Sequence, residues 1–452
     1  MVFKSIFPYT QEVIAEYTLM DDAAINKCLK AAEKAYPVWK SKTFDERAVV
    51  LKNVASILKR DKDALAALIT HEMGKVIAES KGEVEKCAFT CEYYAEHAEA
   101  FLKDEPHEAG YTKSFVTYEP IGAVLAIMPW NFPFWQVFRY AAPTLMAGNV
   151  TMLKHAPNVC GCAKIIEQIF LEAGANECVF QTLIIDTPVV EKLLGENIVQ
   201  AVTLTGSERA GSSVAAIAGR NVKKSLMELG GSDALIVLPD ADMKNAATVA
   251  LQSRMLNAGQ SCIGSKRFII LEKAMDAFME EINTQIKNLK QGDPFDQSVT
   301  IGPMARLDLV ENIEKQLQKS VAAGAQLTYG GEVSGCNFNP ALLINVKKGM
   351  LAFDQETFGP LAAIISAKDE AEAIALANSS EYGLAGSVWT KDIDKGIAVA
   401  RQITTGAVFI NSLVKSDPRL PFGGVKKSGY GRELGRHGIL EFVNAKTIAA
   451  AL

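Results

Sequence analysis

Residues 201–219 read "AVTLTGSERAGSSVAAIAG", and this single stretch indicates the fold class. An apolar, β-branched run ends at a Gly-Ser pair, and small and apolar residues then recur at helical spacing. A strand, a tight joint and a helix in this order make up part of a βαβ unit. Free N–H groups at such a helix start attract phosphate, but a joint of this kind is also how α/β proteins without a nucleotide are built.

The same alternation extends along the chain in both directions. A first series of strand-like runs comprises "AVLAIM", "VTMLK", "VFQTLII" and "AVTLT", and a second comprises "DALIVL", "KRFIIL", "AAIISA", "SVWT" and "GAVFIN". Continuous apolar runs of this length are typical of parallel strands that are buried on both faces. We therefore expect two open, mostly parallel α/β domains, with a boundary at the glycine pair of "ELGGSD" and helices over the first hundred or so residues.

Two segments belong to neither series. "YTKSFVTYEP" (111–120) alternates like a short strand, and "LEFVNAKTIAAAL" (440–452) closes the chain. Strands without a sheet of their own commonly pair with another subunit, so these segments predict a homo-oligomer.

The composition restricts the partners. The chain has 452 residues, 47 basic and 52 acidic, with no long run of one sign, which favours neither nucleic acid nor an anionic membrane as a partner. No apolar run approaches the ~20 residues that span a bilayer. Eight cysteines are too sparse for a disulfide framework, and five scattered histidines suggest no zinc site. We expect a reduced, cytoplasmic protein without a metal.

Four side chains follow expected strands, where ligands gather in open parallel sheets. They are Asn131 in "PWNFP", Lys154 in "VTMLKH", Ser207 after "AVTLT", and Glu228 in "SLMELGG". Each has an ordinary alternative: a turn asparagine, a solvated lysine, a plain strand–helix joint and a paired glutamate. Apolar neighbours of Glu228 predict a raised pKa, which suits a general base.

Cys262 lies in "NAGQSC" (257–262), directly before an apolar strand-like run. Its glycine-rich surroundings predict a depressed thiol pKa and a reactive sulfur, although free cysteines are often buried for packing alone. Together these residues supply a nucleophile, a base, an amide donor and a dinucleotide platform.

The chain resembles the aldehyde dehydrogenase superfamily nearly end to end, through motifs that occur in the family's order and spacing. These motifs are "PWNFP", "MELGG", "NAGQSC", "ETFGP" and "PFGGVKKSGYGRE". The resemblance implies a variant Rossmann domain that binds NAD(P) (1–105 and 121–230), a thiol-bearing catalytic domain (231–435) and a small β oligomerisation flap (106–120 and 436–452). It further implies a homodimer or homotetramer.

The resemblance also assigns roles to residues. Cys262 matches the nucleophile, Glu228 the base that activates water, and Asn131 the amide that holds the oxyanion together with the Cys262 N–H. The residues that match cofactor contacts are Trp130, Lys154, Ser207, Glu356 and Phe358. The implied reaction oxidises an aldehyde to an acid through a thiohemiacetal and a thioester.

Members that prefer NAD often carry a glutamate three residues after the lysine, where a carboxylate repels a 2′-phosphate. This chain has Pro157 there, so we expect NADP to be accepted and even preferred. Arg139 and Ser416 match residues that bind the substrate carboxylate in succinate-semialdehyde dehydrogenases, and a bacterial NAD(P)-dependent branch is the most similar.

Two departures weaken this assignment. Leu256 replaces a frequent arginine before "N-x-G-Q", and Gly264 replaces a second cysteine, so we expect no disulfide switch. Arg139 has an alternative role in a surface or interdomain ion pair. The aromatic residues Phe134, Trp135 and Phe138 equally favour a broader range of aldehydes.

Two further readings keep the scaffold and change the activity. A CoA-acylating dehydrogenase typically lacks the base, so Glu228 argues against that class. A non-catalytic scaffold would lack the nucleophile, the base or the amide, and all three are present.

Overall fold

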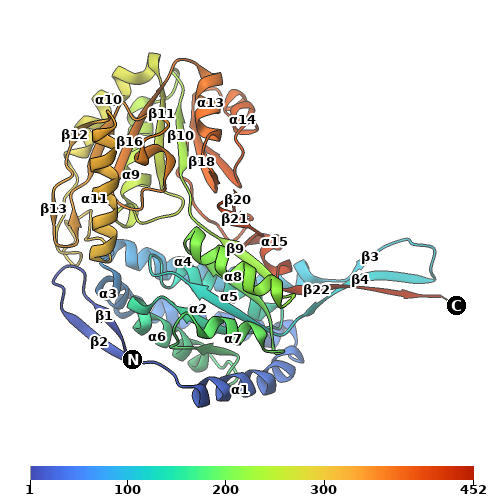
Figure 1. The fold of residues 1–452 in the computed structure, drawn as a ribbon. Coiled ribbons are helices and arrows are strands. Elements are labelled where there is room, and N and C mark those ends of the chain that lie inside the picture. Colours follow the sequence, from blue (N-terminus) through green and yellow to red (C-terminus); the bar gives the residue numbers. More distant parts are fainter. Residues whose placement is uncertain (1, 452) are drawn as a thin grey trace.

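The computed structural model describes residues 2–451. Two α/β units make up the body in Figure 1, and a thin β-ribbon that carries the C-terminus projects from the lower unit. The helices are α1 Asp22–Lys40, α2 Phe44–Arg60, α3 Lys62–Met73, α4 Ile77–Leu102, α5 Trp135–Met146, α6 Cys160–Glu172, α7 Val189–Gly195, α8 Glu208–Arg220, α9 Met243–Met255, α10 Glu272–Ile286, α11 Leu307–Ala322, α12 Leu351–Asp354, α13 Glu370–Asn378, α14 Ile393–Ala400 and α15 Gly435–Leu440. The 3-10 helices are η1 Pro157–Val159 and η2 Leu256–Gly259.

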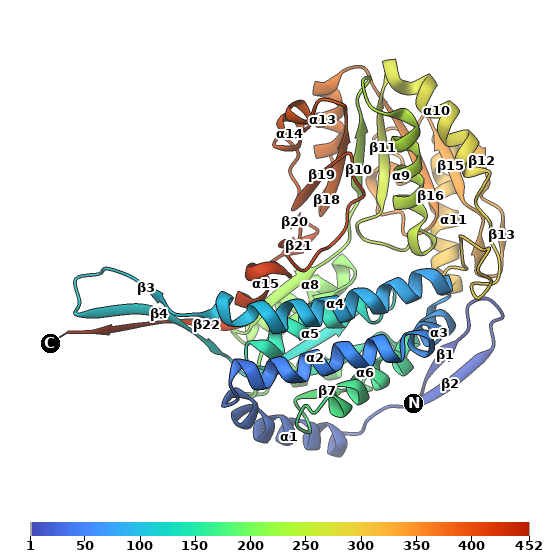
Figure 2. The same ribbon diagram turned by 180° about the vertical axis from the view of Figure 1, so that it is seen from behind.

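The strands of the lower unit form a sheet of six, in the order β21-β9-β8-β5-β6-β7. All neighbours are parallel except β21, which is antiparallel to β9. The bounds are β5 Ala123–Met128, β6 Val150–His155, β7 Phe180–Thr182, β8 Val199–Thr205, β9 Lys224–Glu228 and β21 Gly429–Tyr430. The central strands are apolar and fully covered, and the long helices α2 and α4 lie across the front of this unit in Figure 2.

The strands of the upper unit form a sheet of seven, in the order β12-β15-β16-β11-β10-β18-β19. Only the β12–β15 pair is antiparallel. The bounds are β10 Asp233–Val237, β11 Ser265–Leu271, β12 Gln326–Tyr329, β15 Ala341–Ile344, β16 Leu361–Ala367, β18 Ala385–Trp389 and β19 Ala407–Ile410. The expected α/β class with mostly parallel sheets is therefore confirmed, and the chain passes between the sheets at the glycine pair 230–231.

The smaller sheets depart from the expectations. A hairpin of β1 Val2–Ile6 and β2 Val13–Thr18 precedes the first helix, where only helices were expected. Its tip reaches the upper unit, since the rings of Phe7 and Phe295 lie 6.0 Å apart. The remaining short strands are β13 Val333–Ser334, β14 Asn337–Phe338, β17 Tyr382–Gly383 and β20 Val425–Lys426.

The projecting ribbon corrects a second expectation. β22 Val443–Ala450 pairs along its whole length with β4 Lys113–Pro120, and β3 Glu105–Pro106 completes a three-stranded antiparallel sheet. The two segments that were expected to have no sheet within their own chain thus form one with each other. Within residues 2–451, no helix combines the length and apolarity needed to cross a membrane.

Candidate active site

Cys262 is held in a loop with unusual backbone geometry. Asn257, Ala258 and Gly259 adopt positive φ angles of 54°, 51° and 73° in succession, which turns the chain sharply between α9 and β11. The buried Lys266 ammonium then donates hydrogen bonds to the carbonyl oxygens of Ser261 (2.7 Å) and Cys262 (2.6 Å). A cation on the following strand therefore fixes the peptide groups on both sides of the sulfur-bearing residue.

Three of the sequence motifs meet at this loop. A Cβ on Gly259 would lie 2.2 Å from the carbonyl oxygen of Gly359, so the "NAGQSC" and "ETFGP" loops touch backbone to backbone. A Cβ on Gly231 would lie 2.7 Å from the carbonyl oxygen of Cys262, which places "MELGG" against the same loop. The Gly231 N–H also donates to Glu356 Oε1 at 3.0 Å. Glycine is required here because any side chain would push these loops apart.

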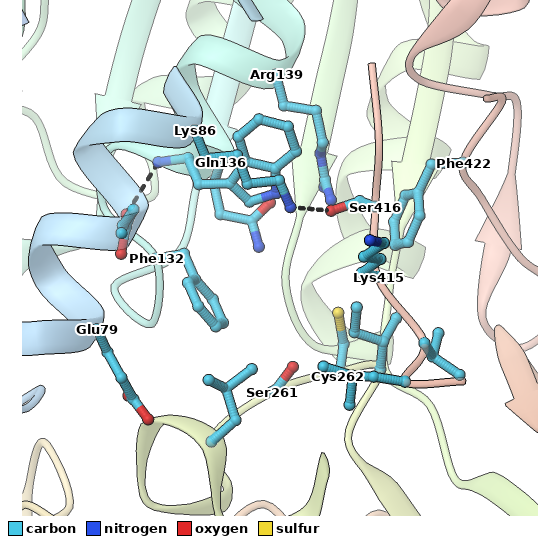
Figure 3. A pocket seen from close by; sticks show the side chains of 17 residues that line it. Glu79, Lys86, Phe132, Gln136, Arg139, Ser261, Cys262, Lys415, Ser416 and Phe422 are labelled. Atoms are coloured by element: carbon cyan, nitrogen blue, oxygen red, sulfur yellow. Dashed lines mark hydrogen bonds between the residues drawn. The ribbon is translucent and has the colours of Figure 1, made fainter. Parts of the chain in front are cut away.

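Two cavities meet at Cys262. The first, which we call the α4 cavity, has a volume of about 270 Å³ and is drawn in Figure 3. The second, the β8 cavity, has a volume of about 380 Å³ and lies along the loop after β8. Cys262 and Gln136 line both cavities. A thiol at such a junction can be reached from two directions by two different molecules.

The pKa of the Cys262 thiol contradicts the expectation of a depressed value. Burial raises it to about 12, and the positive charges of Lys266 and Arg139 offset this only in part. Desolvation disfavours the thiolate more strongly than these two cations favour it. The sulfur is therefore a neutral thiol in the free protein near pH 7.

Asn131 lies beside the cysteine loop and lines the β8 cavity. Its Nδ2 donates to the carbonyl oxygen of Gln260 at 3.0 Å, and its Oδ1 has no hydrogen-bond partner within residues 2–451. Asn257 Nδ2 in turn donates to the Asn131 carbonyl at 2.7 Å. The amide is thus positioned next to Cys262, although it donates to a backbone carbonyl in this conformation.

Glu228 ends β9 and is only 2% exposed. Burial raises its pKa well above the usual value, the charge of Glu433 adds to the rise, and Arg139 and Arg432 oppose it. Its Oε1 has no hydrogen-bond partner within the described chain. This oxygen lies 2.6 Å from the position that a Cβ on Gly423 would take. The carboxyl group does not line either cavity, but its charge reaches the Cys262 thiol.

Arg139 and Ser416 both line the α4 cavity, as Figure 3 shows. Arg139 is 2% exposed and forms an ion pair with the equally buried Glu433. The same guanidinium donates to Thr205 Oγ1 at 3.2 Å and lies 4.8 Å from the ring centre of Phe422. The Arg139 charge is thus already compensated from within the chain.

The Ser416 hydroxyl accepts a hydrogen bond from Lys86 Nζ at 2.8 Å. Among the aromatic residues expected near the substrate, only Trp135 lines the α4 cavity, together with Phe132. Phe134 and Phe138 are fully buried and stack on each other at 6.1 Å, so they belong to the core.

The β8 cavity contains most of the expected cofactor residues. Trp130, Ser207, Glu356 and Phe358 all line it, and the rings of Trp130 and Phe358 meet edge to face at 5.9 Å. Ser207 caps α8 and accepts the Ala210 N–H at 3.3 Å. This cavity continues into an open hollow along the start of α8, with which it shares Ser207 and Glu356.

Lys154 lies apart from these residues, at the end of β6, and does not line the β8 cavity. It is 8% exposed and forms no ion pair within residues 2–451, and burial lowers its pKa. The β8 cavity combines a helix N-terminus at Ser207, the aromatic faces of Trp130 and Phe358 and the Cys262 thiol, a lining that fits a dinucleotide.

The structure adds three residues that the motifs did not suggest: Lys86, Lys266 and Glu433. Glu433 ends the motif "PFGGVKKSGYGRE" but was given no role, and Lys86 lies in none of the motifs. The contacts of both residues come from segments far away in the sequence. Lys266 had a local signal, since a lysine inside the apolar run of "KRFIIL" has to find partners for its ammonium group. Among the described residues, no group of three or more His, Cys, Asp or Glu side chains is arranged to hold a metal ion.

The chain is similar to known proteins over almost its whole length. A profile described as "Aldehyde dehydrogenase family" matches residues 1–448. A probable succinate-semialdehyde dehydrogenase (NADP(+)) of Synechocystis sp. is 46% identical over 451 residues, which cover 99% of each chain. A succinate semialdehyde dehydrogenase (NAD(P)+) of Escherichia coli is 43% identical over 98% of this chain and 97% of its own.

Solved structures give the same answer. The crystal structure of succinic semialdehyde dehydrogenase from Streptococcus pyogenes in complex with NADP+ is similar with a TM-score of 0.97 and 40% identity, over 100% of both chains. The family match over almost the whole length and relatives above 40% identity leave one assignment. The protein belongs to the aldehyde dehydrogenase family.

Proposed function

We propose that the protein oxidises succinate semialdehyde to succinate and uses NADP+ or NAD+ as the oxidant. The observation that carries this proposal is the position of Cys262, which lines both the α4 cavity and the β8 cavity. An aldehyde in the first cavity and a dinucleotide in the second would meet at the sulfur. The names of the Synechocystis, E. coli and S. pyogenes relatives supply the substrate and the cofactors.

The reaction begins when the Cys262 sulfur attacks the aldehyde carbon and gives its proton to water, which leaves the negative charge on the former carbonyl oxygen. A raised thiol pKa means that this proton leaves only as the new bond forms, helped by the charges of Lys266 and Arg139. The Asn131 amide turns from the Gln260 carbonyl to donate to the oxyanion, together with the Cys262 N–H. These donors stabilise charge that develops only in the transition state.

Trp130, Ser207, Glu356 and Phe358 would hold the dinucleotide, which would supply a hydride acceptor beside Cys262. Lys154, free of any ion pair in the described chain, is available to the adenosine end. Pro157 is exposed at the start of η1 and presents no carboxylate there, so a 2′-phosphate is accommodated. This arrangement supports NADP+ as well as NAD+.

Glu228 completes the reaction by taking a proton from the water that hydrolyses the Cys262 thioester. Its raised pKa makes it a stronger base than a solvated glutamate. Because it lies just outside both cavities, its side chain has to rotate toward Cys262, and its unpartnered Oε1 leaves it free to do so. Water rather than CoA is therefore the acyl acceptor.

A panel of aldehydes that differ in length and charge tests the proposal, with NAD(P)H absorbance followed for both cofactors and with and without CoA. Succinate semialdehyde should give the highest kcat/KM, NADP+ should be accepted, and CoA should change neither rate nor product. Cys262→Ser should remove activity while the fold is retained. Equal turnover of carboxylated and neutral aldehydes would refute the substrate, and a large preference for NAD+ would refute the cofactor argument.

We also propose the division into domains and an assembly. The dinucleotide domain comprises 1–105 and 121–230, the thiol domain 231–435, and the flap 106–120 and 436–452. The separate main sheets support this division, except that β21, within 231–435, pairs with β9 of the dinucleotide domain. The ribbon of β3, β4 and β22 projects from the body, and β22 exposes most of its side chains while those of β4 are mostly half-buried, which suits pairing in a homodimer or homotetramer. Eight free cysteines suit a reducing compartment such as the cytoplasm.

A further inference from the structure

The α4 cavity contains a lysine whose charge has no carboxylate partner. Lys86 of α4 lines this cavity, and its Nζ reaches across it to Ser416, as Figure 3 shows. The ammonium lies 3.9 Å from the ring centre of Trp135. It takes part in no ion pair within residues 2–451, so its hydrogen bond and its aromatic contact leave one N–H donor unassigned.

The other charged groups around the cavity are already paired or lie elsewhere. Arg139 is paired with Glu433, and Glu83 is paired with Lys75. The carboxylate of Glu83 also accepts the N–H groups of Phe134 and Trp135, at 2.8 and 2.9 Å, at the start of α5. Glu83 is therefore unavailable to Lys86.

Two charged residues of the cavity remain, Glu79 and Lys415. Glu79 is at the opposite side of the cavity in Figure 3, where it accepts the Asn257 N–H at 2.9 Å. Lys415 lines the cavity but is exposed to solvent. Lys86 is thus the partly buried cation of the α4 cavity whose charge is not paired with a carboxylate. An anion that enters the cavity can pair with it.

We propose that Lys86 binds the distal carboxylate of the substrate, with the Ser416 hydroxyl as a second donor, and that Arg139 supports the pocket without itself pairing with the substrate. This inference rests on the proposed function and names the residue that selects a carboxylated aldehyde. Because Ser416 accepts its bond from Lys86, its own O–H remains free to donate to a carboxylate oxygen. Two donors from opposite walls would then converge on one anion.

The position of the sulfur agrees with this assignment. In Figure 3 the Cys262 sulfur points into the cavity, toward the end where Lys86 meets Ser416. A short chain with an aldehyde at one end and a carboxylate at the other would connect the two sites, while Phe132, Trp135 and Leu256 provide apolar walls between them. A neutral aldehyde would leave the ammonium without an anionic partner.

The electrostatics of Lys86 support the geometry. Burial lowers its pKa to about 8, the nearby charge of Arg139 lowers it further, and Cys87, Glu83 and Asp417 oppose the change. A carboxylate that binds beside the ammonium would stabilise the charged form of Lys86, so the electrostatics favour binding of an anion in this cavity. The group loses its charge as the pH rises through this value, and carboxylate binding should weaken with it.

The test compares succinate semialdehyde with butanal, a neutral aldehyde of the same carbon number, in the full-length protein. In Lys86→Met we expect the ratio of the two kcat/KM values to fall by about 30-fold, the loss typical of one hydrogen bond between charged groups. The fall should come from KM for the semialdehyde, and inhibition by succinate should weaken in parallel. Lys86→Arg, which keeps the charge, should retain most of the ratio.

Lys81→Met is the matched control. Lys81 lies on the same helix, forms an exposed ion pair with Asp63 and lines neither cavity, so the ratio should not change. The wild-type ratio should also decline above about pH 8, and this decline should vanish in Lys86→Met. Dividing by the butanal value removes the titrations of Cys262 and Glu228, which both substrates share.

The outcomes separate the two claims. A wild-type preference for the semialdehyde that survives in Lys86→Met, with unchanged inhibition by succinate, overturns the role of Lys86 and leaves the proposed function standing. A wild-type protein that oxidises both aldehydes equally overturns the proposed function, and the inference falls with it.

Discussion

The ion pair of Arg139 and Glu433 gives a prediction that separates a structural from a substrate-binding role. Both side chains are almost fully buried, with 2% and 3% of their area exposed. Arg139→Met removes one partner and leaves the Glu433 carboxylate unpaired in the interior. There its charge already raises the pKa of Glu228. Breaking a buried pair in this way costs about 3–5 kcal/mol in the free energy of unfolding.

Glu433→Gln should destabilise the protein by a similar amount, because it leaves the Arg139 guanidinium unpaired. The double variant should lose less stability than the sum of the two single variants, with a coupling energy of about 2 kcal/mol. Urea unfolding of the two single variants and the double variant, followed by intrinsic fluorescence, measures this cycle. As a control, Arg220→Met breaks the exposed pair with Glu191 and should cost less than about 1 kcal/mol.

The kinetic result completes the test. If Arg139 serves the pocket through Glu433, Glu433→Gln gives no tighter binding of succinate semialdehyde. If Arg139 instead waits for the substrate carboxylate, releasing it from Glu433 lowers KM. Additive effects on unfolding together with a lower KM in Glu433→Gln would refute the structural reading.

Three further predictions concern the chemistry and the cofactor. Glu228→Gln should give a burst of about one NADPH per subunit, followed by turnover that is slowed by about 10²–10⁴-fold, because only the hydrolysis step loses its base. Stopped-flow absorbance measures the burst, and its absence would contradict the prediction. Pro157→Glu should lower kcat/KM for NADP+ by about tenfold or more, because the new carboxylate repels the 2′-phosphate, while kcat/KM for NAD+ changes little. Equal losses for both cofactors would count against this explanation. Alkylation of Cys262 by iodoacetamide should accelerate about tenfold per pH unit between pH 7 and 10, since the thiolate fraction does so below a pKa of about 12. Mass spectrometry of the Cys262 peptide measures this rate, and a plateau near pH 8 would mean a depressed pKa instead.

The sequence predicted much of the fold because the two main sheets are built from continuous apolar runs. "AVLAIM" and "KRFIIL" became β5 and β11 because strands buried on both faces leave no polar positions to obscure the pattern. The β1–β2 hairpin escaped prediction because its residues are mostly exposed and lack such a run. The ribbon strands β4 and β22 were recognised, but their mutual pairing joins segments more than 300 residues apart and has no local signature.

The candidate site was predictable where a role is written into one motif. Cys262 and Asn131 lie in the loops of their motifs and line the β8 cavity, whereas Glu228 ends β9 and lines neither cavity. The raised pKa of Glu228 follows from its apolar neighbours. The pKa of Cys262 was predicted in the wrong direction because local glycines do not reveal that the fold partly buries the residue and so disfavours the thiolate. The partners of Arg139 and Lys86 depend on which distant side chains the fold brings together.

The contact between Gly259 and Gly359 has a consequence for engineering. One loop carries the sulfur and the other carries Glu356 and Phe358, and with no side chain between them neither can shift without pushing its neighbour. A library that remodels residues 356–360 to retune nucleotide choice would therefore also displace the reactive atom. Retuning of this protein should succeed only when both segments are randomised together.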